Sequence, residues 1–170
     1  MITKTMSTKH SVEPGLTKKT VLIPVEQADF SLQILPYVER FLNPTENRLI
    51  LLHVEKEPDV VHIDRPGFTD LDIYVDQSEA AWRTNFLDDL LPTVRALEKL
   101  GFEVQTDVQF GTPVHELEYY IKHRQVDLVA MTTHGRSPLG RVIFGSVAEH
   151  ILHDINVPIL LFHPADKTSQ

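Results

Sequence analysis

The chain has 170 residues, of which 42% are hydrophobic and 24% charged, a balance typical of one globular domain with a substantial core. The formal net charge of −8 argues against a general nucleic-acid-binding protein, because a nucleic acid repels an acidic surface. Cysteine is absent, which excludes disulfides, thiolate metal sites and a cysteine nucleophile, and suits a cytoplasmic location. No apolar run is long enough to cross a membrane, and the first residues lack the apolar segment of a secretory signal.

Polar segments without helix or strand periodicity lie at both ends of the chain. Residues 1–17, which contain Pro14 and Gly15, are predicted to form a flexible N-terminal tail, and residues 165–170 a polar C-terminal tail. A single α/β domain is expected between them, over residues 18–164.

Short apolar runs predict five β-strands. They occupy residues 20–25, 48–54, 102–110, 126–131 and 158–162. The second run is continuously apolar, as in a strand that is buried on both faces of a parallel sheet. The third alternates between apolar and polar residues, so we expect it nearer an edge of the sheet.

Helical patterns lie between successive strands, over residues 30–42, 77–100 and 113–124 and after Ser146. Asp29 or Ser31 is expected to cap the first helix, and Pro36 to kink or break it. Thr112 is expected to cap the third. The second helix carries one apolar stripe at helical spacing, formed by Ala80, Leu87, Leu90, Leu91, Val94 and Leu97.

Strands that alternate with helices in this way predict an α/β fold. We expect one doubly wound open sheet of five parallel strands, in the order 3-2-1-4-5, with helices on both faces. In such sheets ligands bind beyond the carboxyl ends of the strands, where the strand order reverses. Here those ends lie at Val25 and Glu26, at Val54, and at Met131 and Thr132.

Two features raise the question of a metal site. Residues 55–75 contain prolines and many aspartates, and we predict an irregular lid, partner surface or mobile segment, with solvated carboxylates rather than bound Mg²⁺. His150 and His153 stand one helical turn apart, but no third ligand lies near them in sequence. A solvated or packed histidine pair is therefore predicted, and no metal site.

The most informative stretch is a βαβ unit over residues 126–162, whose loop reads TTHGRSPLGRVIFGS. Such a unit directs backbone N–H groups and a helix N-terminus at the space above the strand, which suits an anion. The P-loop signature is not met, because Arg141 and Val142 stand in place of Lys and Ser or Thr. The dinucleotide motif G-x-G-x-x-G and the hydrolase motif G-x-S-x-G are absent.

The loop spacing, with the strands TVLIPV, LILLHV and VPILLF, resembles the universal stress protein family over residues 20–162. The resemblance implies that ATP is held by the pattern G-x₂-G-x₉-G-[ST], and that an Asp after the first strand and a Val ending the second contact the nucleoside. Four positions match this pattern, namely Gly135, Gly145, Ser146 and Val54. Thr132 replaces the first Gly and Glu26 the Asp, so we expect nucleotide binding to be weakened rather than abolished.

The expected nucleotide site combines the strand ends with the loop and the start of the last helix. Its residues are Pro24, Val25, Glu26, Val54, Met131, Thr132, His134, Gly135, Arg136, Gly145, Ser146 and Val147. Several of these residues have an alternative role that does not involve a ligand. Gly145 either permits backbone that a Cβ would hinder or merely permits a turn, and Ser146 with Glu149 matches a capping box. His134 and Arg136 either contact phosphate or are packed and solvated, and Thr132 either crowds the phosphate or bonds it.

The last apolar run is Val157-Pro158-Ile159-Leu160-Leu161-Phe162. A terminal strand in this fold is commonly an edge, and an exposed apolar edge must be covered or paired. Pairing with a second copy would form a two-fold homodimer, and the family resemblance implies dimerisation through this strand. The alternative is a monomer in which the N-terminal tail covers the edge.

Three functions follow, in order of preference. The first is a cytoplasmic, dimeric stress-response protein that binds ATP, with or without Mg²⁺, as a regulatory ligand. The second is a nucleotide-independent dimeric interaction protein with a protein partner, which Thr132 and Glu26 favour. The third is an enzyme, either an ATPase or a nucleotidyl transferase of the wider α/β family. Such an enzyme needs a general base and a second substrate site, and we find neither, so we expect no catalytic residue and at most slow ATP hydrolysis. Neither nucleic acid nor membrane is expected as a partner.

Overall fold

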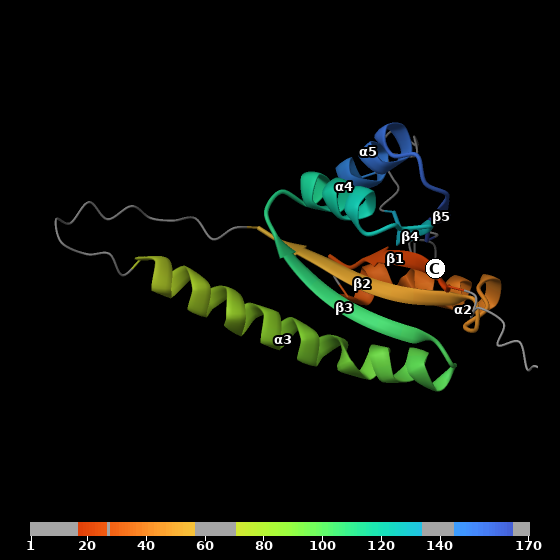
Figure 1. Cartoon of the computed structure of the whole chain (residues 1–170), viewed down its shortest axis with the longest axis horizontal. Coiled ribbons are helices and arrows are strands. Elements are labelled where there is room, and N and C mark those ends of the chain that lie inside the picture. Colours follow the sequence, from red (N-terminus) through yellow and green to blue (C-terminus); the bar gives the residue numbers. More distant parts are fainter. Residues whose placement is uncertain (1–16, 27, 57–70, 134–144, 165–170) are drawn as a thin grey trace, which may run out of the picture.

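The fold is known from a computed structural model, which describes residues 17–26, 28–56, 71–133 and 145–164 (Figure 1). Its elements in chain order are β1 (Lys19–Pro24), α1 (Ala28–Ser31), the 3₁₀ helix η1 (Leu32–Ile34), α2 (Leu35–Phe41), β2 (Asn47–Glu55), α3 (Leu71–Lys99), β3 (Glu103–Phe110), α4 (Pro113–His123), β4 (Leu128–Thr132), α5 (Ser146–Asp154) and β5 (Ile159–Phe162). No helix within these ranges is long and apolar enough to cross a membrane.

The strands form one five-stranded sheet in the order β3-β2-β1-β4-β5. Every pairing is parallel, as the alternation of strands and helices predicted. Chain order reverses between β1 and β4, so the carboxyl ends of these two strands flank the position where α/β sheets bind ligands. The prediction that the alternating strand lies near an edge is also confirmed, because β3 is an edge strand.

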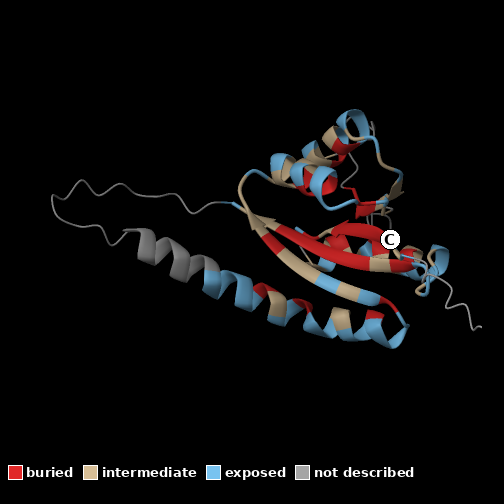
Figure 2. Cartoon of the chain, in the orientation of Figure 1, coloured by how far each residue is buried: buried red, intermediate tan, exposed pale blue. Residues whose placement is uncertain are grey.

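Helices cover both faces of the sheet. In Figure 1, α3 runs along one side and α4 and α5 lie on the other. The core under α3 and α2 contains Leu49 and Leu51 of β2 together with Phe86 and Leu90 of α3. The core under α4 and α5 includes Leu22, Leu52, Leu117 and Ile151. The central strands are therefore buried from both sides (Figure 2), as their continuous apolar sequence indicated.

Helix α3 begins earlier than its sequence pattern suggested. Residues 71–75 are helical rather than irregular, while residues 57–70 of the predicted loop lie outside the described part of the chain. The predicted apolar stripe holds for the buried Leu90 and Leu97, but Ala80 is exposed and Leu91 is 40% exposed. Phe86 is buried in their place. Leu87 and Val94 are partly buried against the same core, so the predicted stripe is wrong only at Ala80 and Leu91.

The segment after β1 is not one continuous helix. It is divided into α1, η1 and α2, and Pro36 lies in the first turn of α2, as the predicted break near this proline requires. The segment already begins as a helix at Ala28, so neither Asp29 nor Ser31 caps its start. Ser31 takes the N-cap position of η1, but its side chain makes no capping hydrogen bond. The Ser31 hydroxyl instead accepts a hydrogen bond from the Glu26 N–H at 3.1 Å. Serine in this position holds the turn between β1 and α1.

Candidate functional site

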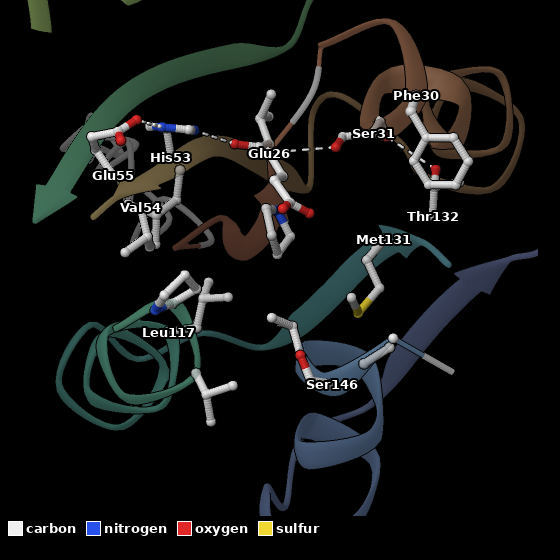
Figure 3. Close-up of a pocket in the computed structure, with 18 of the residues that line it drawn as sticks. Glu26, Phe30, Ser31, His53, Val54, Glu55, Leu117, Met131, Thr132 and Ser146 are labelled. Carbon is white, nitrogen blue, oxygen red and sulfur yellow. Dashed lines mark hydrogen bonds and ion pairs between the residues drawn. The ribbon is translucent and has the colours of Figure 1, made fainter. Parts of the chain in front are cut away.

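A cavity of about 630 Å³ lies at the carboxyl ends of β1, β2 and β4 (Figure 3). Every predicted site residue in the described ranges lines it: Pro24, Val25, Glu26, Val54, Met131, Thr132, Gly145, Ser146 and Val147. His134, Gly135 and Arg136 were also predicted, and they lie outside the described residues. The sheet thus brings together strand ends and a helix start that are far apart in sequence.

The start of α5 forms one wall of this cavity, which Gly145, Ser146, Val147 and Ala148 line. Gly145 is the N-cap residue and Ser146 the first residue of the helix. The predicted cap at Ser146 is therefore wrong by one position, since a cap must precede the first turn. In the described structure the Ser146 hydroxyl has no hydrogen-bond partner, and Figure 3 shows it beside the cavity. The first N–H groups of the helix have no partners within it and favour an anion.

A second helix start, which the sequence did not predict as part of the site, borders the same cavity. Thr112, Pro113 and Val114 at the beginning of α4 all line it. Thr112 occupies the predicted N-cap position, but its side chain makes no capping hydrogen bond. The positive ends of the α4 and α5 dipoles therefore meet around one space, which favours a negatively charged ligand.

Gly145 does not have the strained backbone that we expected. Its φ of −55° and ψ of 157° are open to any residue. A Cβ built on it would meet no atom of the described structure within 4 Å. Neither the backbone conformation nor a contact with the described residues therefore requires a glycine at this position. A side chain at this position would occupy space beside the cavity. A glycine instead lets a ligand approach the backbone closely.

The hydroxyl of Thr132 is bonded to the protein backbone rather than directed at a ligand. The Oγ1 atom donates a hydrogen bond of 3.0 Å to the carbonyl oxygen of Ser31, and the residue is buried. This bond ties the end of β4 to α1 (Figure 3). Of the two explanations that the sequence left open, hydrogen bonding to phosphate is the less compatible one, because the donor is already used.

Glu26 carries an exposed carboxylate at the edge of the cavity. Its backbone N–H is bound by Ser31, whereas its carboxylate has no partner among the described residues. The carboxylate is therefore available to accept hydrogen bonds from a hydroxyl-bearing ligand. Val54 lies across the end of the adjacent strand (Figure 3) and packs with the core under α4 and α5.

His53 and Glu55 form a polar pair that sequence reasoning missed. The His53 Nδ1 lies 2.6 Å from the Val25 carbonyl oxygen, and its Nε2 lies 3.1 Å from the Glu55 Oε2. A carbonyl oxygen and a carboxylate both accept hydrogen bonds, so each contact is suited to a ring N–H donor. The buried His53 thereby links the end of β2 to the end of β1. No local pattern marked it, because its partners become neighbours only through strand pairing.

Lys56 and Trp82 also line the cavity without having been predicted. Lys56 follows β2 and is exposed, and it contributes a positive charge beside Glu26 and Glu55. Trp82 comes from α3, on the opposite side of the sheet from α4 and α5, and it is 42% exposed. The one available signal was that this large aromatic residue falls outside the predicted apolar stripe of its helix.

Of the predicted pair of histidines, His150 and His153, only His150 has contacts that connect two helices in the described structure. The His150 ring on α5 contacts Glu118 of α4 at 3.0 Å through Nε2, and Asp154 at 2.9 Å through Nδ1. His153 is exposed. Among the described residues no cluster of three or more metal-ligating side chains occurs.

Comparison with known proteins gives a consistent result. The model of the universal stress protein family matches residues 18–163. Universal stress protein MJ0577 of Methanocaldococcus jannaschii is 25% identical to this chain over 151 residues, covering 84% of this chain and 93% of the relative. The solved structure of MJ0577 has a TM-score of 0.68 and covers 88% of this chain and 98% of its own.

Two further solved structures share the fold and contain nucleotides. An Arabidopsis thaliana universal stress protein family member with AMP bound is 14% identical, has a TM-score of 0.56, and covers 89% of this chain and 95% of its own. A universal stress protein in complex with cAMP is 20% identical, has a TM-score of 0.52, and covers 86% of this chain and 97% of its own.

Proposed function

Because this chain belongs to the universal stress protein family, we propose that it is a stress-response protein that binds ATP in the cavity as a regulatory ligand. The observation that carries the proposal is Gly145, which stands at a helix start where neither the backbone conformation nor any described neighbouring atom requires a glycine. A ligand that approaches this backbone closely explains the glycine. The AMP and cAMP found in two relatives of the same fold support an adenine nucleotide as that ligand.

The phosphates fit the end of the cavity formed by α4 and α5. The free N–H groups at both helix starts and the hydroxyl of Ser146 supply donors. Lys56, on the cavity wall, supplies a positive charge for the phosphates. ATP carries several negative charges, so this end of the cavity suits it better than it suits a neutral ligand.

The nucleoside fits the end of the cavity beside β1 and β2. The walls there are largely apolar, with Val25, Leu52 and Val54, and Glu26 brings an unpartnered carboxylate. An apolar cavity with a few placed polar groups is the usual form of a small-molecule site, and a volume of about 630 Å³ is in the usual range. The Glu26 carboxylate can accept from ribose hydroxyls, as an Asp in this position would.

The second part of the proposal is a homodimer through β5. This strand is an edge of the sheet, and its residues Ile159–Phe162 are all only partly buried. An apolar strand with one unpaired side favours pairing with another chain. A two-fold pairing of β5 with its own copy would extend both sheets and close the assembly.

The test of nucleotide binding is thermal unfolding with and without excess ATP and Mg²⁺, on protein freed of bound ligand. Ligand at about 100 times its Kd adds roughly 2.7 kcal/mol to the free energy of unfolding. For a domain of this size the expected rise in Tm is about 5–10 °C. A parallel arm with EDTA in place of Mg²⁺ shows whether the cation contributes.

The sharpest variant is Gly145→Asp, with Gly145→Asn as its matched control. Both residues are favoured at an N-cap, so both variants should fold at least as stably as the wild type. The carboxylate of Gly145→Asp would repel the phosphates and remove the ATP-dependent rise in Tm, whereas the neutral Gly145→Asn would retain more of it. An unchanged Tm for the wild type at millimolar ATP would reject the proposal and favour a nucleotide-independent interaction protein.

A further inference from the structure

We propose that Trp82 is a binding residue that stacks on the base of the nucleotide. The proposal rests on the nucleotide function given above and adds a contact from α3, on the other side of the sheet from the phosphate end. Trp82 is the only tryptophan of the chain. It lines the cavity and is 42% exposed.

The indole is held in place by neighbouring rings. The His53 ring lies 5.0 Å from the Trp82 ring, centroid to centroid, with an interplanar angle of 10°. Phe86 lies 4.4 Å from His53 and 6.1 Å from Trp82. His53 is itself bound to the carbonyl of Val25 and to Glu55. A chain of contacts therefore runs from the end of β1 to the indole and fixes its orientation before a ligand arrives.

The position of Trp82 would bring it close to the base of the bound nucleotide rather than to the phosphates. It stacks on His53 of β2, and β2 ends beside Val54, at the end of the cavity that fits the nucleoside. The N–H groups that would donate hydrogen bonds to the phosphates lie at the starts of α4 and α5. These helices pack on the opposite face of the sheet from Phe86 of α3. A planar base is the part of a nucleotide that gains from an aromatic surface.

A partly exposed indole beside a cavity has apolar surface that a ligand can cover. Aromatic side chains in this setting are common binding hot spots. Stacking depends on the π-face that every base has and not on its hydrogen-bonding edge. The Trp82 contact therefore favours any purine, and it should not by itself distinguish ATP from GTP.

The only tryptophan makes the inference directly measurable, because fluorescence excited selectively from tryptophan reports on this one side chain. We expect ATP and adenosine to quench this fluorescence in a saturable way, and inorganic tripolyphosphate, which has no base, to leave it unchanged. Free tryptophan amide titrated in parallel corrects for absorption by the nucleotide.

Affinities of Trp82→Ala and Trp82→Phe, measured by calorimetry, complete the test. Loss of the stacking surface should weaken ATP binding about ten-fold in Trp82→Ala, while Trp82→Phe keeps a ring and should stay within about three-fold of the wild type. Tripolyphosphate should bind all three proteins equally. Tyr119→Ala is the matched control, because Tyr119 is 61% exposed and stacks on His123 of α4 without lining the cavity.

The two proposals fail in different ways. If ATP raises the Tm of the wild type but leaves its fluorescence unchanged, and Trp82→Ala binds ATP with wild-type affinity, the role of Trp82 is overturned and nucleotide binding stands. If the wild type binds neither ATP nor adenosine in calorimetry, both are overturned.

Discussion

Gly145 and Gly111 are both glycines next to a helix start, but the structure needs only one of them. Gly111 has a φ of +143°, and a Cβ there would lie 2.8 Å from the Glu116 Oε1. Gly145 has an ordinary negative φ and open space around it. A glycine that the fold does not require is the better indicator of a binding site, since a ligand can account for it.

This contrast predicts that the same substitution destabilises the protein to different extents at the two positions. Gly111→Ala should lower the free energy of unfolding by about 1–2 kcal/mol, because an L-residue is strained at this φ. Gly145→Ala should cost less than about 1 kcal/mol, the difference between Gly and Ala at an N-cap. Chemical denaturation without nucleotide measures both. Equal losses in the two variants would show that Gly145 is needed for folding and would remove the main support for the site.

The sequence predicted which residues line the cavity better than it predicted their hydrogen bonds. Thr132 ends β4 and Glu26 follows β1, and such positions could be predicted because a parallel sheet gathers strand ends at one edge. The bond from Thr132 to Ser31 joins residues 101 positions apart, and no local pattern contains it. The contact of His53 with Val25 depends in the same way on the pairing of β1 with β2.

Among the elements, those packed along their whole length were predicted best. The apolar runs located every strand to within a few residues, since each strand of the sheet contributes to the core. Helix α3 was predicted less well because residues around Ala80 are exposed, so burial imposes no apolar stripe on them. This exposed part of α3 also carries Trp82, so no apolar pattern in the sequence placed α3 at the cavity.

Helices α4 and α5, whose starts border the cavity, are joined by an ion-pair cluster. Glu118 of α4 contacts Lys122 of the same helix and His150 of α5. The hydrogen bonds from Lys122 and then from His150 hold the pKa of Glu118 below its usual value of 4.5. A carboxylate with a lowered pKa contributes stability above the pKa of the unfolded chain. That contribution is lost as the pH falls through the folded-state pKa.

We therefore expect stability to fall more steeply in acid for the wild type than for Glu118→Gln. The free energy of unfolding, measured by chemical denaturation from neutral pH to about pH 3, should fall more in the wild type below about pH 4.5, the usual pKa of the carboxyl. Glu39→Gln on α2 is the control, since Glu39 is exposed and has no partner in the described structure. Parallel pH curves for the wild type and Glu118→Gln would show that the cluster does not stabilise the contact between α4 and α5.

At the scale of the whole molecule, the predicted order of strands is the one observed. The favoured right hand of each crossover limits the orders that an α/β sheet can adopt. The convergence of two helix starts on one cavity was less accessible to sequence reasoning. It depends on α4 and α5 packing side by side on one face, through the core that contains Leu117 and Ile151. The same topology leaves β5 as the outermost strand beyond β4, with no described strand paired on its outer side.

The unpaired side of β5 can be identified from its hydrogen bonds. Pro158 and Phe162 direct their carbonyl oxygens at β4, where they accept from Val129 and Thr133 at 3.0 and 2.9 Å. Backbone groups alternate along a strand, so the N–H and C=O groups of Ile159 and Leu161 point to the free edge. These are the groups that a second copy would pair with in the proposed homodimer.

Leu161→Pro should therefore abolish the dimer while leaving the bonds between β4 and β5 intact, because proline removes only an outward-facing N–H at this position. Leu161→Ala is the matched control, since it removes most of the same side chain but keeps the N–H group. Sedimentation equilibrium over a wide concentration range should show a dimer for the wild type and Leu161→Ala, and a folded monomer for Leu161→Pro. A wild type that stays monomeric, or a Leu161→Pro variant that still dimerises, would exclude β5 pairing, and a helix surface would then be the place to look for an interface.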